Sequence, residues 1–261
     1  MTLDVRVSTA SPLCGVAAGV LLQTAVLGGL AAGVGLGPSG WLAGAAFAVS
    51  TWAVLSSALI RSGATSLGPA NAVTLARCTL VGGVTALVAD SLANDHPPVV
   101  VLVTLAVVAW LMDGIDGQVA RRTGTTTKLG GRFDGEVDSI LALVLSVYVA
   151  DSLGLWVVVA IGAYRYLFLM AGWGLPWLRA ELPRRQSRSA IAAVQGIVLI
   201  VAAAGVVPDS VMTTIAGVSL AVLTFSFGRD ILSLYRKHTT ETAVVRTAPA
   251  SEPFVGVGQS S

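Results

Sequence analysis

The chain has 261 residues, of which 54% are hydrophobic and only 11% are charged. Soluble domains contain about 25% charged residues, so this composition excludes a soluble globular domain, and its apolar content excludes a disordered chain. The net charge of +2 is too small to imply a nucleic acid as partner. The composition predicts a protein that crosses the membrane several times, in which each charge inside a span is informative.

About eight apolar segments approach the roughly 20 residues that a helix needs to cross a bilayer. They lack the period-two alternation of strands, so we expect an all-α integral membrane protein. In chain order the expected spans are Pro12–Gly35, Trp41–Ile60, Asn71–Ala89, Pro98–Asp116, Asp134–Ala150, Leu155–Leu175, Ala190–Val207 and Val211–Leu232. The first segment is too long for a signal peptide and has no convincing cleavage site, so we interpret it as a span, with a cleaved leader as the alternative.

The basic residues fall in alternate connections between these spans. One side of the membrane receives Arg6, Arg61, the Arg121–Arg132 and Arg179–Arg188 clusters, Arg229, Arg236, Lys237 and Arg246. The other side receives Asp90, Asp95, His96, Asp151 and Asp209, without any Lys or Arg. Because short cytoplasmic loops carry the excess of Lys and Arg, this pattern predicts a multi-pass protein of the cell membrane with both termini in the cytoplasm.

Three parts of the chain are expected from its composition. Residues 1–60 form an N-terminal pair of transmembrane helices, and a linker with Gly63, Gly68 and Pro69 separates this pair from a six-span core over residues 61–238. The tail, residues 239–261, is rich in Thr, Ser, Pro and Gly, and we expect it to be disordered on the cytoplasmic side.

One polar stretch of the core combines acidic and small residues at helical spacing. On one helix face it places Asp113, Asp116, Gly117, Ala120 and Arg121, at i, i+3, i+4, i+7 and i+8. On one face of the next helix it places Gly130, Asp134 and Asp138, at i, i+4 and i+8. The loop between the two helices is short, so we expect their acidic faces to meet near the cytoplasmic end of both spans.

Four carboxylates at close quarters repel one another, and a hard divalent cation relieves this repulsion. Ligands that are all oxygen suit Mg²⁺, Mn²⁺ or Ca²⁺, and the absence of His and Cys argues against zinc. One or two ions are consistent with such a set. The alternative is that these Asp residues only cap a helix in water, but four of them on two facing surfaces favour a metal site.

These residues carry the pattern D-x2-D-G-x2-A-R-x8-G-x3-D-x3-D, in which the chain resembles the CDP-alcohol phosphatidyltransferase family. A weaker resemblance extends to Asn71, Thr74 and Arg77, which look like the family's entry to its first core span. The shared six-span core would cover about Pro69 to Leu232, and the first two spans lie outside it.

The resemblance implies a transferase of phospholipid biosynthesis that moves a phosphatidyl group from CDP-diacylglycerol to an alcohol and releases CMP. By this analogy Asp113, Asp116, Asp134 and Asp138 hold one or two Mg²⁺ or Mn²⁺ ions, and Asp138 also acts as the general base. The family's CDP site would comprise Asn71, Thr74, Arg77, Asp116, Gly117, Ala120, Arg121 and Gly130. The partners implied are the CDP-linked lipid, a small alcohol and membrane lipids, and a homodimer is a family-level expectation.

The acceptor is less well specified by the sequence. Arg165 lies within an apolar span, where a charge is costly unless it faces a polar cavity or an acidic partner. Arg165, Arg179, Arg188 and Gln195 are therefore candidates for binding an acceptor, and inositol phosphate or glycerol phosphate would explain the basic residues. The Arg-Glu pair and the Lys-x-Lys-Thr-x-x-Gln run associated with glycerol-phosphate enzymes are absent, so serine, a polyol and a non-lipid CDP donor also stay open.

Two other classes of function compete with a transferase. A cation-coupled transporter would use the Asp cluster to bind its ion, although transporters usually place such sites near the membrane midplane. An inactive scaffold is the third possibility, and the intact spacing at all eight positions of the pattern argues against it.

Overall fold

The computed structural model describes residues 12–62, 69–94, 98–123, 128–175, 177 and 186–247, and this part of the chain contains helices and no strand. The helices are α1 (Pro12–Val34), α2 (Pro38–Ser62), α3 (Pro69–Asn94), α4 (Val99–Thr123), α5 (Lys128–Leu153), the short 3₁₀ helix η1 (Trp156–Val158), α6 (Val159–Gly174), α7 (Gln186–Ala203) and α8 (Asp209–Thr247). Each expected span coincides with a helix, so the all-α prediction is confirmed.

Five segments of these helices are long and apolar enough to cross a membrane. They are Ala17–Val34, Pro38–Ser57, Val73–Asn94, Trp156–Gly174 and Asp209–Arg236, and Val99–Gly114 and Ala190–Ala203 are shorter apolar helices. The apolar part of α5 lies between Asp138 and Asp151, which explains its absence from this set. The protein is therefore multi-pass, while the count of eight spans stays a prediction.

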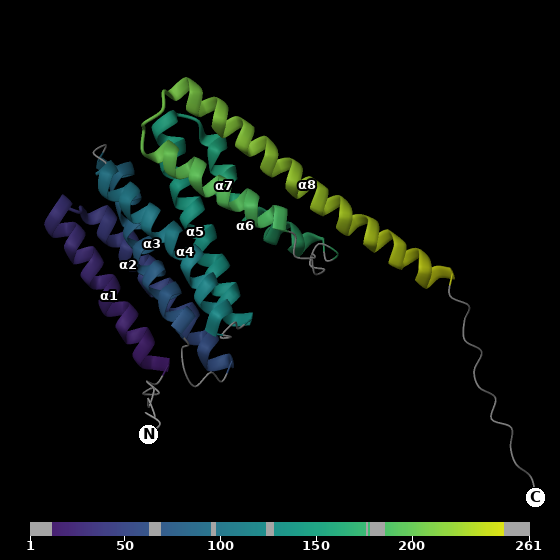
Figure 1. Cartoon of the computed structure of the whole chain (residues 1–261), viewed down its shortest axis with the longest axis horizontal. Coiled ribbons are helices and arrows are strands. Elements are labelled where there is room, and N and C mark those ends of the chain that lie inside the picture. The colour runs from purple at the N-terminus through teal and green to yellow at the C-terminus, as the bar shows by residue number, and fades with distance from the viewer. Residues whose placement is uncertain are drawn as a thin grey trace, which may run out of the picture.

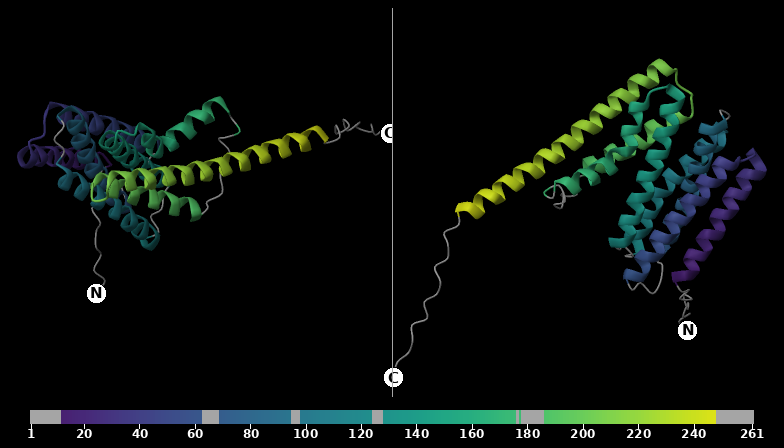
Figure 2. Two further views of the ribbon diagram at one scale, coloured as in Figure 1. Left: turned by 90° about the horizontal axis from the view of Figure 1, so that it is seen from above. Right: turned by 180° about the vertical axis from the view of Figure 1, so that it is seen from behind.

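The first five helices form a bundle in which consecutive helices alternate in direction (Figure 1). Because of this alternation, the first turns of α3 and α5 and the last turns of α4 lie at the same end (Figures 1 and 2). The centre of the bundle is α3, which packs against α1, α2, α4 and α5. Its side chains Val81, Val84 and Leu87 are fully buried in the core.

The remaining helices pack on the side of the bundle that α4 and α5 form. η1 and α6 pack on α5, α7 packs on α4 and α5, and α8 lies against α6 and α7. At Gly162 on α6, an added Cβ atom would lie 2.3 Å from the Cα atom of Leu143 on α5. Only glycine permits this close approach of the two backbones, and the approach places the following turn of α6 beside the polar face of α5.

The last helix is longer than its expected span, which ended at Leu232. α8 continues to Thr247 and projects away from the bundle (Figure 1). Residues 239–247, which the composition predicted to be disordered, are therefore helical, because each residue added to an existing helix costs little compared with nucleating a new one. The rest of the tail lies outside the described residues.

Candidate metal and transfer site

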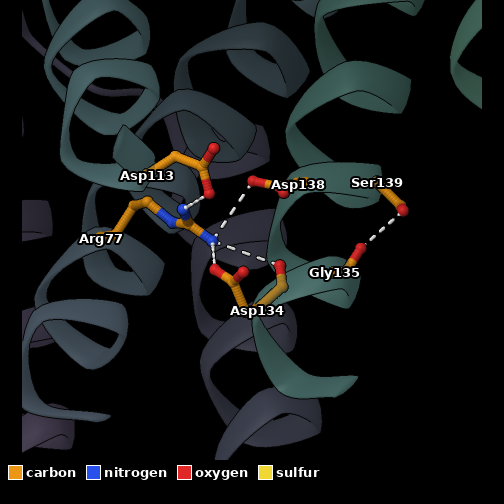
Figure 3. Close-up of polar contacts among 6 residues, drawn as sticks. All are labelled: Arg77, Asp113, Asp134, Gly135, Asp138 and Ser139. Atoms are coloured by element: carbon orange, nitrogen blue, oxygen red, sulfur yellow. Dashed lines mark hydrogen bonds and ion pairs between the residues drawn. The ribbon is translucent and has the colours of Figure 1, made fainter. Parts of the chain in front are cut away.

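Three carboxylates from two helices converge at the cytoplasmic end predicted for the bundle. Asp113 lies on α4, and Asp134 and Asp138 lie one turn apart on α5. One oxygen atom from each carboxylate lies within 4.8 Å of the others. The two acidic faces thus meet as the helical spacing predicted, and Figure 3 shows the three side chains pointing toward one another.

The guanidinium group of Arg77, on α3, lies between these carboxylates (Figure 3). Its Nη1 donates a hydrogen bond to Asp113, and its Nη2 donates to the side chain of Asp134 and, at 3.2 Å, to the backbone carbonyl of Asp134. The same Nη2 forms an ion pair with Asp138 at 3.2 Å. One cation thus links three anions that belong to two other helices.

Burial differs sharply between the two sides of this network. The Arg77 side chain is 1% exposed, while the side chains of Asp113, Asp134 and Asp138 are 41%, 34% and 48% exposed. A buried guanidinium must be paired, and hydrogen bonds to carboxylates are the strong kind of pairing. The carboxylates are accessible from the other side, so a ligand can reach them.

The donor set fits a hard divalent cation. Carboxylate oxygen is the preferred protein ligand of Mg²⁺ and Mn²⁺, and three such groups from two rigid helices converge here. The fourth expected ligand, Asp116, lies on α4, but its side chain is outside the described residues.

The other predicted CDP-binding residues are only partly described. Thr74 is buried on α3, one turn before Arg77, and Gly130 lies in the first turn of α5. Outside the described side chains are Asn71, Gly117, Ala120 and Arg121, although each of these residues lies within a helix.

A cavity of about 460 Å³ adjoins the acidic cluster. Residues of α4, α5, α6, α7 and α8 line it, and they include Asp113, Asp138, Arg165 and Gln195. The structure thus brings two of the four predicted acceptor residues to the same space as the predicted base, Asp138. Of the other two, Arg179 lies outside the described residues, and the side chain of Arg188 on α7 is not described either.

Arg165 pairs with Glu136, a carboxylate that lies outside the predicted set of site residues. Its Nη2 lies 2.5 Å from Glu136 on α5, and both side chains are about two-fifths exposed (41% and 43%). Gly135 gives the guanidinium room, because an added Cβ atom there would be 3.4 Å from Nη1 of Arg165. A lone Arg within a span signals that an acidic partner exists, but it does not say which one.

Gln195 links α7 to α8 by hydrogen bonds. Its amide nitrogen donates to the backbone carbonyl of Ser219 at 2.9 Å, and its amide oxygen accepts from the Ser219 hydroxyl at 2.5 Å. These two bonds use the amide oxygen and one N–H, so Gln195 acts first as a link between helices that form the cavity wall.

Comparison with known proteins gives one finding. Searches of curated proteins and of solved structures found no match, whereas the family model of CDP-alcohol phosphatidyltransferase matches residues 68–227. This range begins one residue before α3 and ends within α8, so it contains the acidic cluster, Arg77 and the cavity. With a match over more than half of its length, the chain belongs to the CDP-alcohol phosphatidyltransferase family.

Proposed function

We propose that the protein transfers a phosphatidyl group from CDP-diacylglycerol to the hydroxyl group of a small alcohol and releases CMP. Family membership already makes it a transferase with a role in phospholipid synthesis. The observation that carries the proposal is the convergence of Asp113, Asp134 and Asp138 beside a cavity that Asp113 and Asp138 line, within the matched region. A cation transporter would leave the family match unexplained.

The chemistry follows from where these groups lie. The acceptor oxygen forms a bond to the phosphorus of the phosphatidyl group, the bond from that phosphorus to CMP breaks, and the proton of the acceptor hydroxyl goes to a base. Asp113, Asp134 and Asp138, with Asp116 as a proposed fourth ligand, would hold a divalent ion, which would supply positive charge for the diphosphate. Oxygen ligands suit both Mg²⁺ and Mn²⁺, which are the ions that the family resemblance implies.

Asp138 is the proposed general base. Its side chain is 48% exposed and lines the cavity, so an acceptor hydroxyl in the cavity can reach it. Arg165 lines the same cavity on α6, and we propose that it binds a phosphate group on the acceptor. An acceptor that carries phosphate, such as inositol phosphate or glycerol phosphate, would use both residues.

The membrane supplies the rest of the setting. We propose that the acidic cluster faces the cytoplasm, because Arg61, Arg121 and Arg122 lie at the same end of the bundle and short cytoplasmic loops concentrate Arg. The tails of the lipid donor would then stay in the bilayer while its diphosphate reaches the ion. The core of residues 61–238 would carry this reaction, and residues 1–60 would support it.

The test is CMP release by the purified full chain. CDP-diacylglycerol, Mg²⁺ or Mn²⁺, and one acceptor at a time are supplied, and Asp134→Ala serves as the control. We expect release with one acceptor and loss of release in the control, which would also identify the alcohol. Release that is equal in Asp134→Ala, or that needs no divalent ion, would contradict the proposed site.

Replacing Arg165 by Ala should affect the acceptor far more than the donor. Because a hydrogen bond to a charged group contributes about 1.5–3 kcal/mol, we expect the KM for the acceptor to rise by about 10- to 100-fold, while the KM for the CDP-linked lipid changes little. Steady-state kinetics with each substrate varied in turn measures both values.

Glu136→Gln is the matched control, because it removes the negative charge that faces Arg165 and keeps the guanidinium. In this variant the KM for the acceptor should stay the same or fall. Equal increases for donor and acceptor in Arg165→Ala would instead indicate that Arg165 only supports the fold.

A further inference from the structure

Arg77 holds the three carboxylates in a way that bears directly on how they bind an ion. It contacts the Oδ1 atom of Asp113, of Asp134 and of Asp138 with its two terminal nitrogens. Asp134 accepts a second bond from Arg77 through its backbone carbonyl, so the arginine also holds the first turns of α5 against α3.

The guanidinium and a divalent ion make the same demand on these groups. Both need carboxylate lone pairs, and both lower the repulsion among three negative charges. An arginine keeps its positive charge at any pH relevant to proteins, so it cannot yield its place by losing a proton. Two cations drawn to the same three carboxylates repel each other, so one weakens the binding of the other.

We propose that Arg77 is a competing counterion of the metal site, so that a divalent ion takes over part of the contacts that its guanidinium makes with the three carboxylates. This inference rests on the proposed metal site at Asp113, Asp134 and Asp138. Arg77 sets how tightly the site binds its ion, because loosening the contacts of the guanidinium offsets part of the free energy of ion binding. Arg77 is thus a positioning residue that acts through the ligands of the ion.

The effect of removing Arg77 on ion binding distinguishes competition with the ion from a purely structural role. If Arg77 only held the carboxylates in place, its removal would weaken ion binding, because the ligands would lose their arrangement. If it competes with the ion, its removal strengthens ion binding and weakens the fold without ion, since the three carboxylates then lose the positive charge that Arg77 places among them. The two roles predict changes of opposite sign.

The experiment compares Mn²⁺ binding by the full chain in detergent for the wild type, Arg77→Met, Arg77→Lys and Asp134→Ala. The amplitude of the electron paramagnetic resonance signal of free Mn²⁺ gives Kd, and thermal unfolding with EDTA or with Mn²⁺ gives Tm. For Arg77→Met we expect a Kd at least tenfold lower than that of the wild type, a lower Tm in EDTA, and a larger rise of Tm on addition of Mn²⁺. Lys keeps the charge but lacks the planar fork that reaches several oxygens, so Arg77→Lys should give an intermediate Kd.

The outcomes separate the two proposals. A Kd that is unchanged or higher in both Arg77 variants, with Mn²⁺ binding intact in the wild type, would overturn the competition and leave the metal site standing. The metal site itself would be overturned if the wild type did not bind Mn²⁺, or if Asp134→Ala bound Mn²⁺ as tightly as the wild type. If Arg77→Met does not yield folded protein, the Kd of Arg77→Lys decides the sign.

Discussion

Asp138→Asn should lower the rate of CMP release by about two to four orders of magnitude, which is the usual contribution of a general base. The amide keeps the size of the side chain and one oxygen ligand, but it cannot take a proton from the acceptor hydroxyl. The fold should survive, because Asp113 and Asp134 still pair with Arg77. Turnover is measured in lipid vesicles, with size-exclusion chromatography as the check on folding.

Ser139→Ala is the matched control for this variant. Ser139 is next to Asp138 on α5 and lines the same cavity, but its hydroxyl donates to the carbonyl of Gly135 within its own helix at 2.7 Å. We expect nearly normal turnover in Ser139→Ala. Nearly normal turnover in Asp138→Asn would show that Asp138 is not the base and that another group at the cavity takes the proton.

Gly162→Ala should destabilise the protein and abolish most of its activity. The new Cβ atom would lie 2.3 Å from the Cα atom of Leu143 and 2.6 Å from the carbonyl oxygen of Ala142, and these backbone atoms cannot move without shifting α5. Overpacking of a tight interface costs about 1–3 kcal/mol. The displaced α6 also carries Arg165 away from the cavity. Activity should therefore fall by more than the loss of folded protein alone would explain.

Thermal unfolding in detergent and CMP release measure the two effects of Gly162→Ala. Gly217→Ala on α8 is the control, because an added Cβ atom there meets nothing within 4 Å. Alanine favours a helix over glycine by about 0.5–1 kcal/mol, so this control should be as stable as the wild type or slightly more stable. A normal unfolding temperature for Gly162→Ala would mean that α5 and α6 separate at little cost.

The meeting of the acidic faces could be predicted from the sequence because it depends on local geometry. Residues four apart on a helix share a face, so Asp134 and Asp138 had to point the same way, and a short connection made α4 and α5 close in space. The positions of the helices along the chain could be predicted because each apolar segment approaches the length that a helix needs to cross a bilayer. These inferences need only periodicity and chain connectivity.

The partners of the charged and polar side chains could not be predicted in the same way. Arg77 is 36 residues from Asp113, and its place among the carboxylates depends on α3 packing against both α4 and α5. The family resemblance implied that Arg77 is a ligand of CDP, whereas its contacts with the three Asp residues are seen only in the structure. The pair of Arg165 with Glu136 likewise depends on how closely α6 approaches α5.

The central position of α3 affects how this helix enters the membrane during synthesis of the chain. In the segment Val73–Asn94, about three-fifths of the residues are buried, against about one-fifth in Ala17–Val34 and in Pro38–Ser57. This segment carries the buried polar residues Thr74, Arg77, Thr79 and Ser91, which are costly to expose to lipid. Because synthesis proceeds from the N-terminus, α1 and α2 are available before α3 emerges. The first two helices thus offer the nascent α3 a protein surface in the bilayer, and chains that lack them should insert α3 poorly.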